Sequence, residues 1–103
     1  MIRVHGVVRP TADPELKTVG DKQVVNFRVA TNGRSKDDST FWNCTAWGHL
    51  AETIARYCPK GKQVAIDGIL RQRSYEKDNV KHTVDEIMVL DIELVGGAGG
   101  TNK

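Results

Sequence analysis

Cysteine is scarce in this chain, whose 103 residues include only Cys44 and Cys58. These two lie 14 positions apart, without a CxxC pair or an HxxxH spacing nearby, which argues against a zinc site and against a disulfide framework. We therefore expect both thiols to be reduced and structural, and we expect no metal and no other cofactor. Reduced thiols, together with a first segment that lacks the apolar core of a signal peptide, predict a cytoplasmic protein.

Long hydrophobic runs are also missing. The longest comprises four residues, 87–90, whereas a membrane-spanning helix needs about 20. Hydrophobic residues make up 39% of the chain and charged residues 27%, which is the balance of an ordinary folded domain. The length allows one such domain, which we expect at 1–96, followed by a flexible Gly-rich stub at 97–103.

A large excess of one charge is absent as well, because the net charge is only +2. The charges are nevertheless uneven: residues 1–82 hold 14 Lys and Arg against 9 Asp and Glu, whereas residues 83–103 hold one against four. A modest basic excess on the body is compatible with a polyanionic partner but does not require one. The positions of individual side chains must therefore decide the function.

What the chain has in abundance is alternation of apolar and polar residues. Ile2, Val4 and Val8 share one parity, and Val25, Phe27 and Val29 repeat the pattern, which is typical of strands. We predict five strands, at 2–8, 24–30, 41–47, 63–73 and 88–94. One helix is predicted over 50–57, where apolar residues recur at helical spacing before Pro59 and Gly61. Residues 31–40 and 74–80 are predicted to be polar hairpin tips.

This order of elements, with the helix between the third and fourth strands, is that of the OB-fold, an all-β, five-stranded Greek-key barrel. The mid-strand glycines Gly6 and Gly68 suit the tight curvature of such a barrel. Other small sheets with one helix share the order, so the pattern alone does not decide the fold. Phe27 and Tyr57 are expected in the core, and Phe41 either in the core or on the surface.

The segment FWNCTAWGHLAE at 41–52 resembles the third strand and helix start of bacterial-type single-stranded DNA-binding proteins. The similarity continues through KGKQV at 60–64 and DGILRQRSY at 67–75, and it covers residues 2–97 at the family's spacing. The resemblance implies a homo-oligomeric OB-fold, usually a homotetramer. Such a protein binds and protects single-stranded DNA, without reading its sequence, in DNA replication, recombination and repair.

The resemblance also implies which residues bind DNA. Aromatic side chains that stack on bases correspond here to Trp42, Trp47 and Tyr75, and basic contacts correspond to Lys60, Arg71 and Arg73. Because Trp42 and Trp47 have opposite parity, a straight strand would direct them to opposite faces. Either a bulge or strong coiling brings both to one groove, or one of them lies partly in the core. Further cations for the DNA backbone are expected at Arg3, Arg9, Arg28 and Arg34.

Two features depart from the family's pattern. The hairpin at 31–40 contains no aromatic residue, although family members often carry a stacking tryptophan there. The chain ends in a Gly-rich stub, without the long tail and acidic tip that recruit other proteins in the family. Either a tail has been cut from this sequence or the protein never had one, so the sequence does not predict protein partners that bind through such a tail.

Other functions have less support in the residues. An enzyme such as a small nuclease would need clustered carboxylates or a Ser/His/Asp arrangement. The acidic residues are scattered, and His5, His49 and His82 have no such neighbours in the sequence, so no enzymatic activity is expected. The alternative function is an OB-fold interaction module of a primosome-like assembly with weak nucleic-acid binding. Stacking alone does not distinguish DNA from RNA.

Overall fold

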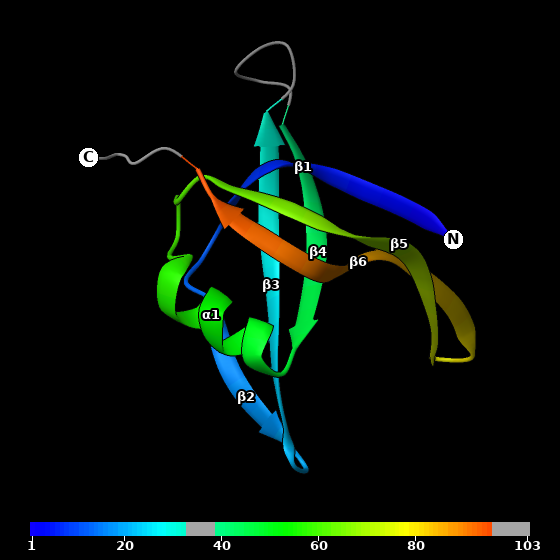
Figure 1. The fold of residues 1–103 in the computed structure, drawn as a ribbon. Coiled ribbons are helices and arrows are strands. Elements are labelled where there is room, and N and C mark those ends of the chain that lie inside the picture. The colour runs from blue at the N-terminus through cyan, green and yellow to red at the C-terminus, as the bar shows by residue number, and fades with distance from the viewer. Residues whose placement is uncertain (33–38, 96–103) are drawn as a thin grey trace.

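Six strands and one helix make up the part of the chain that the computed structural model describes, residues 1–32 and 39–95 (Figure 1). In chain order they are β1 (Ile2–Pro10), β2 (Glu15–Val19), β3 (Lys22–Asn32), β4 (Ser39–Trp47), α1 (His49–Tyr57), β5 (Val64–Lys77) and β6 (Val80–Leu94). The sequence prediction of a mostly β chain with one short helix is confirmed. The predicted turn at Asn32-Gly33, Arg34 and the stub at 97–103 include residues outside the described ranges.

The strands form one sheet in the order β1-β5-β6-β4-β3-β2, in which only the β4–β6 pair is parallel among the described residues. Strand β1 also pairs with β3 through two residue pairs, Arg9 with Ala30 and Pro10 with Val29. The sheet therefore curls until its first strand meets β3, and in Figure 1 β1, β5 and β6 cross over the β3–β4 hairpin. This arrangement is a strongly curled six-stranded sheet and not a clearly closed barrel.

The sixth strand, β2, was not predicted. It pairs with β3 from Glu15 opposite Asn26 to Val19 opposite Lys22, across a turn that contains Gly20 at a φ of 62°. All residues of β2 are exposed, so its sequence carries no alternation between a buried and a solvated face. The helix consequently lies between the fourth and fifth strands of the structure, which are the third and fourth strands of the prediction.

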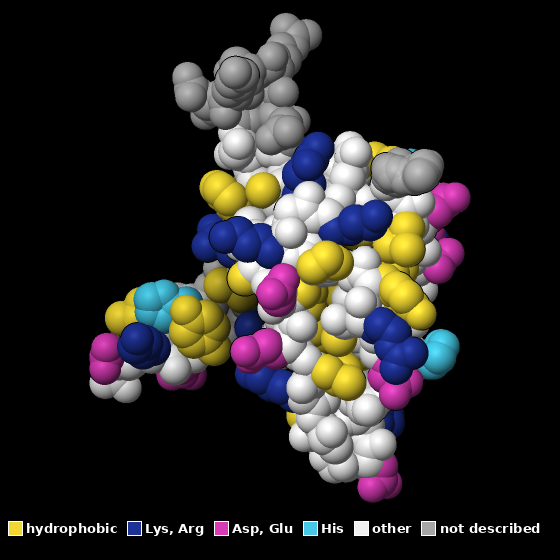
Figure 2. Space-filling view, turned by 90° about the vertical axis from the view of Figure 1, so that its left-hand side faces the viewer, with side chains coloured by type: hydrophobic (Ala, Val, Ile, Leu, Met, Phe, Trp, Pro, Cys, Tyr) yellow, Lys and Arg dark blue, Asp and Glu magenta, His cyan; other side chains and the backbone are white. Residues whose placement is uncertain are grey.

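The segment 74–80, predicted to be a hairpin tip, is largely part of the β5–β6 ladder. Pairing continues to Lys77 opposite Val80, and only Asp78 and Asn79 form the turn. Both have positive φ, 55° and 64°, as a two-residue turn of type I′ requires, and this turn matches the right-handed twist of the strands. The outer halves of β5 and β6 therefore form a two-stranded arm, residues 71–85, which projects from the body at the lower left of Figure 2.

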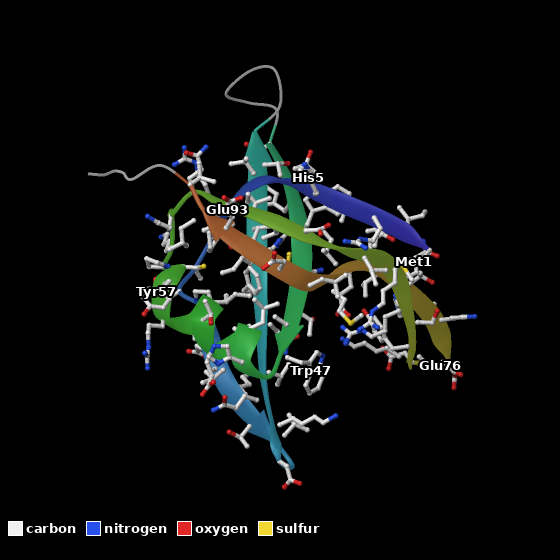
Figure 3. All side chains as sticks on the ribbon, viewed as in Figure 1. Met1, His5, Trp47, Tyr57, Glu76 and Glu93 are labelled. Atoms are coloured by element: carbon white, nitrogen blue, oxygen red, sulfur yellow. The ribbon has the colours of Figure 1, made fainter. Side chains whose placement is uncertain are left out.

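The core lies between the curled sheet and α1. Valines 25 and 29 are fully buried on β3, and α1 contributes Ala51 and Ile54. Tyr57, expected in the core, is instead half exposed at the end of α1 (Figure 3). No helix among the described residues has the length and hydrophobicity to span a bilayer.

Gly68 lies at the point where β5 and β6 shift register between Asp67 and Gly68. A Cβ atom at this position would come closer than van der Waals contact to the Met88 carbonyl oxygen of β6. The close approach of the two backbones therefore requires glycine here, in agreement with the expectation that Gly68 permits curvature. At Gly6 the space around a Cβ atom is open, so the same reason does not apply there.

Candidate nucleic-acid interface

A row of polar side chains crosses four strands on one side of the sheet. Arg28 of β3 is opposite Asn43 of β4, Asn43 is opposite Glu86 of β6, and Glu86 is opposite Arg71 of β5. Residues that are directly opposite one another project from the same side of a sheet. We call this side of β3, β4, β6 and β5 the outer face. It places Arg28 and Arg71 in one lateral row although they are far apart in the sequence.

The neighbouring row projects from the other side, which we call the inner face. Phe27 is opposite Cys44, Cys44 is opposite Ile87, and Ile87 is opposite Leu70. The first three are buried, and Leu70 packs against them. The same strands thus supply the core with one set of residues and the surface with the next.

Three aromatic side chains are half exposed in this region. Phe41 and Trp47 have the same parity as Asn43 on β4, and Tyr75 has the same parity as Arg71 on β5, so all three belong to the outer face. Their exposed fractions are 49%, 43% and 45%, respectively, which leaves much of each ring open to solvent. In Figure 3, Trp47 points toward the side on which the arm, labelled at Glu76, projects.

Phe41 also makes a cation–π contact with Arg28. The guanidinium carbon of Arg28 lies 4.9 Å from the centroid of the Phe41 ring. A guanidinium at this distance is attracted to the electron-rich face of the ring. One aromatic ring of β4 thus has a positive charge from β3 over its face.

Trp42, predicted to stack on DNA, lies on the inner face. It is opposite Val29, it is only partly exposed, and it packs against the core. Its side chain also borders a cavity of about 190 Å³, which is lined mainly by apolar residues such as Val4, Val8 and Leu70. Neither a bulge nor coiling therefore brings the Trp42 side chain to the face that holds Trp47. Of the two adjacent aromatic residues, Phe41 is the one that projects from the outer face.

A polar hollow of about 370 Å³ lies at the centre of the outer face. Its lining includes Asn26, Arg28, Asn43, Thr45, Arg73 and Glu86. Within it the Thr45 hydroxyl donates a hydrogen bond of 2.9 Å to the Asn26 amide oxygen. Because amide, guanidinium and carboxylate groups converge here, the hollow suits a polar or charged ligand better than an apolar one.

Two arginines of β5 meet the carboxylate of the hollow. Arg71 donates a hydrogen bond from Nη2 to Oε1 of Glu86 at 3.1 Å, and Arg73 Nη1 lies 3.8 Å from Oε2 of the same residue. The Glu86 side chain is only 6% exposed, whereas those of Arg71 and Arg73 are 46% and 65% exposed. Both guanidinium groups therefore remain available to a ligand from solvent.

The other predicted basic residues lie elsewhere. Arg3 of β1 donates a hydrogen bond of 2.7 Å to Asp67, with which it forms an exposed ion pair. Arg9, at the end of β1, is exposed, and its Nη1 is 3.4 Å from the carbonyl oxygen of Gly61. Lys60 is exposed in the loop after α1, a loop that lies on the opposite side of the molecule from the arm (Figure 1).

Sequence reasoning missed four residues of the outer face: it left Phe41 open, and it assigned no binding role to Asn43, Glu86 or His82. For Phe41 a signal was present, since positions 41 and 47 share parity. His82 is opposite Tyr75, and the two rings stack with centroids 5.2 Å apart at an angle of 19°. That contact, like the one between Glu86 and Arg71, depends on the β5–β6 register, which local sequence does not reveal.

The fold and this face can be compared with known proteins. The model of the single-strand binding protein family matches residues 2–95. The chain belongs to this family. Membership agrees with the predicted OB-fold and with the described architecture of strands plus one helix between β4 and β5.

Individual relatives cover most of the chain. Single-stranded DNA-binding protein 2 of Streptococcus agalactiae is 43% identical over 99 residues, which span 90% of this chain and 76% of the relative. The single-stranded DNA-binding protein of Clostridium perfringens is 34% identical, over 99% of this chain and 73% of the relative. That of Staphylococcus epidermidis is 32% identical, over 94% and 78%. These matches do not favour the alternative of an interaction module.

Proposed function

We propose that this member of the family binds single-stranded DNA without reading its sequence and protects it during replication, recombination and repair. The observation that carries the proposal is the composition of the outer face. Three half-exposed aromatic rings, Phe41, Trp47 and Tyr75, lie on the same side of the sheet as three arginines, Arg28, Arg71 and Arg73. The names of the relatives support the same substrate.

The physical basis is stacking combined with charge neutralisation. A base that stacks on an aromatic side chain contributes about 1–3 kcal/mol, and every base has a flat face, so the interaction tolerates any sequence. When the arginines of the outer face contact phosphates, they release counterions from the DNA, so the affinity falls as the salt concentration rises. A micromolar dissociation constant corresponds to about 8 kcal/mol, and three stacking contacts at the upper end of the range given for stacking supply most of it before any phosphate contact is added.

The proposed site differs from the sequence expectation in one stacking residue. We place Phe41, Trp47 and Tyr75 at the bases and leave Trp42 to the core. The proposed site on the outer face does not need Arg3, Arg9 or Lys60. These three residues are exposed, so a long DNA strand can still reach them. We propose no catalytic role for any residue.

Tryptophan fluorescence provides the test. In a Trp42→Phe variant, Trp47 is the sole tryptophan, so its emission reports the outer face alone. Titration with an oligothymidine of about 35 nucleotides should quench this emission strongly at low salt and more weakly at high salt. An oligothymidine that neither binds nor quenches would refute the proposal. The matching oligouridine, titrated in parallel, would show whether the chain distinguishes DNA from RNA.

We also propose that the protein is a homotetramer. Along residues 2–8, β1 is paired on its β5 side, and within the described residues its pairing with β3 is confined to Arg9 and Pro10. Unpaired backbone along a strand is a template for a second strand, and the exposed apolar residues Ile2 and Val7 lie on this segment. Light scattering at micromolar concentration should report the mass of four chains, and a monomer would contradict self-association.

The compartment that we propose is the cytoplasm. Both cysteines are free and buried, and burial raises the pKa of the Cys44 thiol to about 12, with the nearby Glu86 carboxylate acting in the same direction. Such thiols stay protonated and unreactive at neutral pH. A protein without disulfides suits a reducing compartment.

A further inference from the structure

The outer face contains one feature that its proposed role does not explain: a buried carboxylate beneath the basic track. Glu86 is 5% exposed, and it is an acidic residue at the centre of a face that is proposed to attract phosphate. A negative charge there opposes the binding of a polyanion. Burying a carboxylate also costs free energy, and an ion pair in such a place is weak evidence for stability.

The contacts of Glu86 indicate a role other than attracting phosphate or stabilising the fold. Arg71 donates to one of its oxygens at 3.1 Å, and Arg73 approaches the other at 3.8 Å. Each guanidinium has five N–H donors, so a contact with Glu86 leaves most donors of each arginine free. Both side chains come from the start of the arm, where every residue is exposed. Without an anchor, long side chains at such positions sample many rotamers.

We propose that Glu86 is a positioning residue, whose buried carboxylate holds the guanidinium groups of Arg71 and Arg73 in place for phosphates of single-stranded DNA. This inference rests on the proposed function. Each rotamer-rich side chain that must be immobilised during binding weakens the affinity by roughly two- to twelve-fold. Two arginines that are already ordered in the free protein avoid most of that loss of affinity. We expect this gain to exceed the loss of affinity that the negative charge of Glu86 causes.

The charge and the positioning predict opposite results for Glu86→Gln. The substitution keeps the size of the side chain and removes one negative charge, so electrostatic attraction alone predicts tighter binding and a steeper salt dependence. Loss of positioning predicts weaker binding, by about three- to ten-fold. A matched control is Asp85→Asn, which removes the same charge from the preceding residue of β6. Asp85 is exposed and accepts a hydrogen bond from Gln72, not from an arginine.

The experiment measures the oligothymidine affinity of the wild type, Glu86→Gln and Asp85→Asn over a range of salt concentrations, with thermal unfolding to establish that each is folded. We expect Glu86→Gln to bind more weakly than the wild type, and Asp85→Asn to bind equally well or up to about two-fold more tightly. A Glu86→Gln protein that binds as tightly as Asp85→Asn would overturn the inference. If the wild type itself does not bind, the proposed function fails first.

A second comparison shows whether the effect passes through the arginines. In a chain that carries Arg71→Gln and Arg73→Gln, Glu86 has no guanidinium partner from β5, so adding Glu86→Gln should cause no further loss of affinity. An equal loss in this background would overturn the inference, because Glu86 would then act by another route.

A third measurement needs neither DNA nor a variant. Nitrogen relaxation of the arginine Nε–H groups in the free protein reports how ordered each guanidinium is. Arg71 should be more ordered than Arg56, an exposed residue in the last turn of α1. Equal mobility of the two would refute positioning even if the substituted chains could not be purified in a folded form.

Discussion

The two faces of β4 differ in what they do with an aromatic residue. On the inner face, Trp42 lies against the core and beside an apolar cavity of about 190 Å³. On the outer face, Phe41 and Trp47 remain about half exposed, although they come from the same nine-residue strand. The difference arises from alternation, because adjacent residues of a strand project to opposite sides. One aromatic strand can therefore stabilise the fold and present a binding surface at the same time.

The faces also differ in their ionisable groups. The inner face holds Cys44, whose pKa burial raises, while the outer face holds arginines and the one buried carboxylate among the described residues, Glu86. The arginines keep this carboxylate paired, and solvent reaches them. Substitutions should therefore separate the two faces: those on the inner face change stability, and those on the outer face change DNA binding.

The largest effect is expected from Trp42→Ala. Because Trp42 is half buried, truncation should lower the free energy of unfolding by about 2–4 kcal/mol, close to the range for core aromatic residues. Urea unfolding followed by circular dichroism measures this loss. The affinity of the folded fraction for oligothymidine should change less than two-fold. A large loss of affinity in folded protein would show that Trp42 contacts DNA.

Phe41→Ala on the outer face should have the converse effect, a loss of DNA affinity with little loss of stability. The loss of one stacked base should weaken oligothymidine binding by about 1–3 kcal/mol, or roughly 5- to 150-fold, with little change in stability because the ring is half exposed. Fluorescence titration measures the affinity, and Tyr57→Ala, which removes another half-exposed aromatic residue, from α1, is the control. If Phe41→Ala and Tyr57→Ala bind alike, Phe41 is not a stacking residue.

The Cys44 thiol predicts a pH dependence of the inner face. Its pKa is raised from 9.0 to about 12 in the folded protein, so the unfolded chain ionises first as the pH rises. The resulting stabilisation is complete below pH 9 and is lost as the pH approaches 12, by at most about 1.4 kcal/mol per pH unit. In urea unfolding, the stability difference between the wild type and Cys44→Ala should therefore shrink above pH 9. A constant difference would refute this origin.

The smallest effect is expected from Arg73→Gln on the outer face. Removing one phosphate contact should reduce the slope of log K against log salt by about 0.7. Arg56→Gln on α1, which makes the same change in charge, should leave the slope nearly unchanged. If both substitutions reduce the slope equally, the backbone follows a broader basic surface than the outer face.

The sequence predicted the inner face well because alternation is a local signal. Val25, Phe27 and Val29 on β3 lie in the core, as their spacing indicates. Strand β2 and the arm were underestimated because their exposed residues carry no such signal. The tight turn at Asp78 and Asn79 became evident only from the backbone, where both residues have positive φ.

The candidate site was less predictable because it depends on register. Parity shows that Trp42 and Trp47 face opposite ways, but not which of them faces inward. That choice depends on pairing Trp42 with Val29 of β3, and the environment of Glu86 depends on pairing it with Arg71 of β5. Contacts between strands far apart in the sequence decided both.

The projecting arm makes the proposed interface bipartite. Trp47 belongs to the body, whereas Tyr75 belongs to a ribbon attached at one end, and two-stranded ribbons have little stability of their own. When a segment of DNA dissociates from Tyr75 while Trp47 still binds the same molecule, that segment stays at a high effective concentration near the arm and rebinds quickly. In the proposed interface, nucleotides can therefore leave and rebind the arm a few at a time while the body retains the DNA.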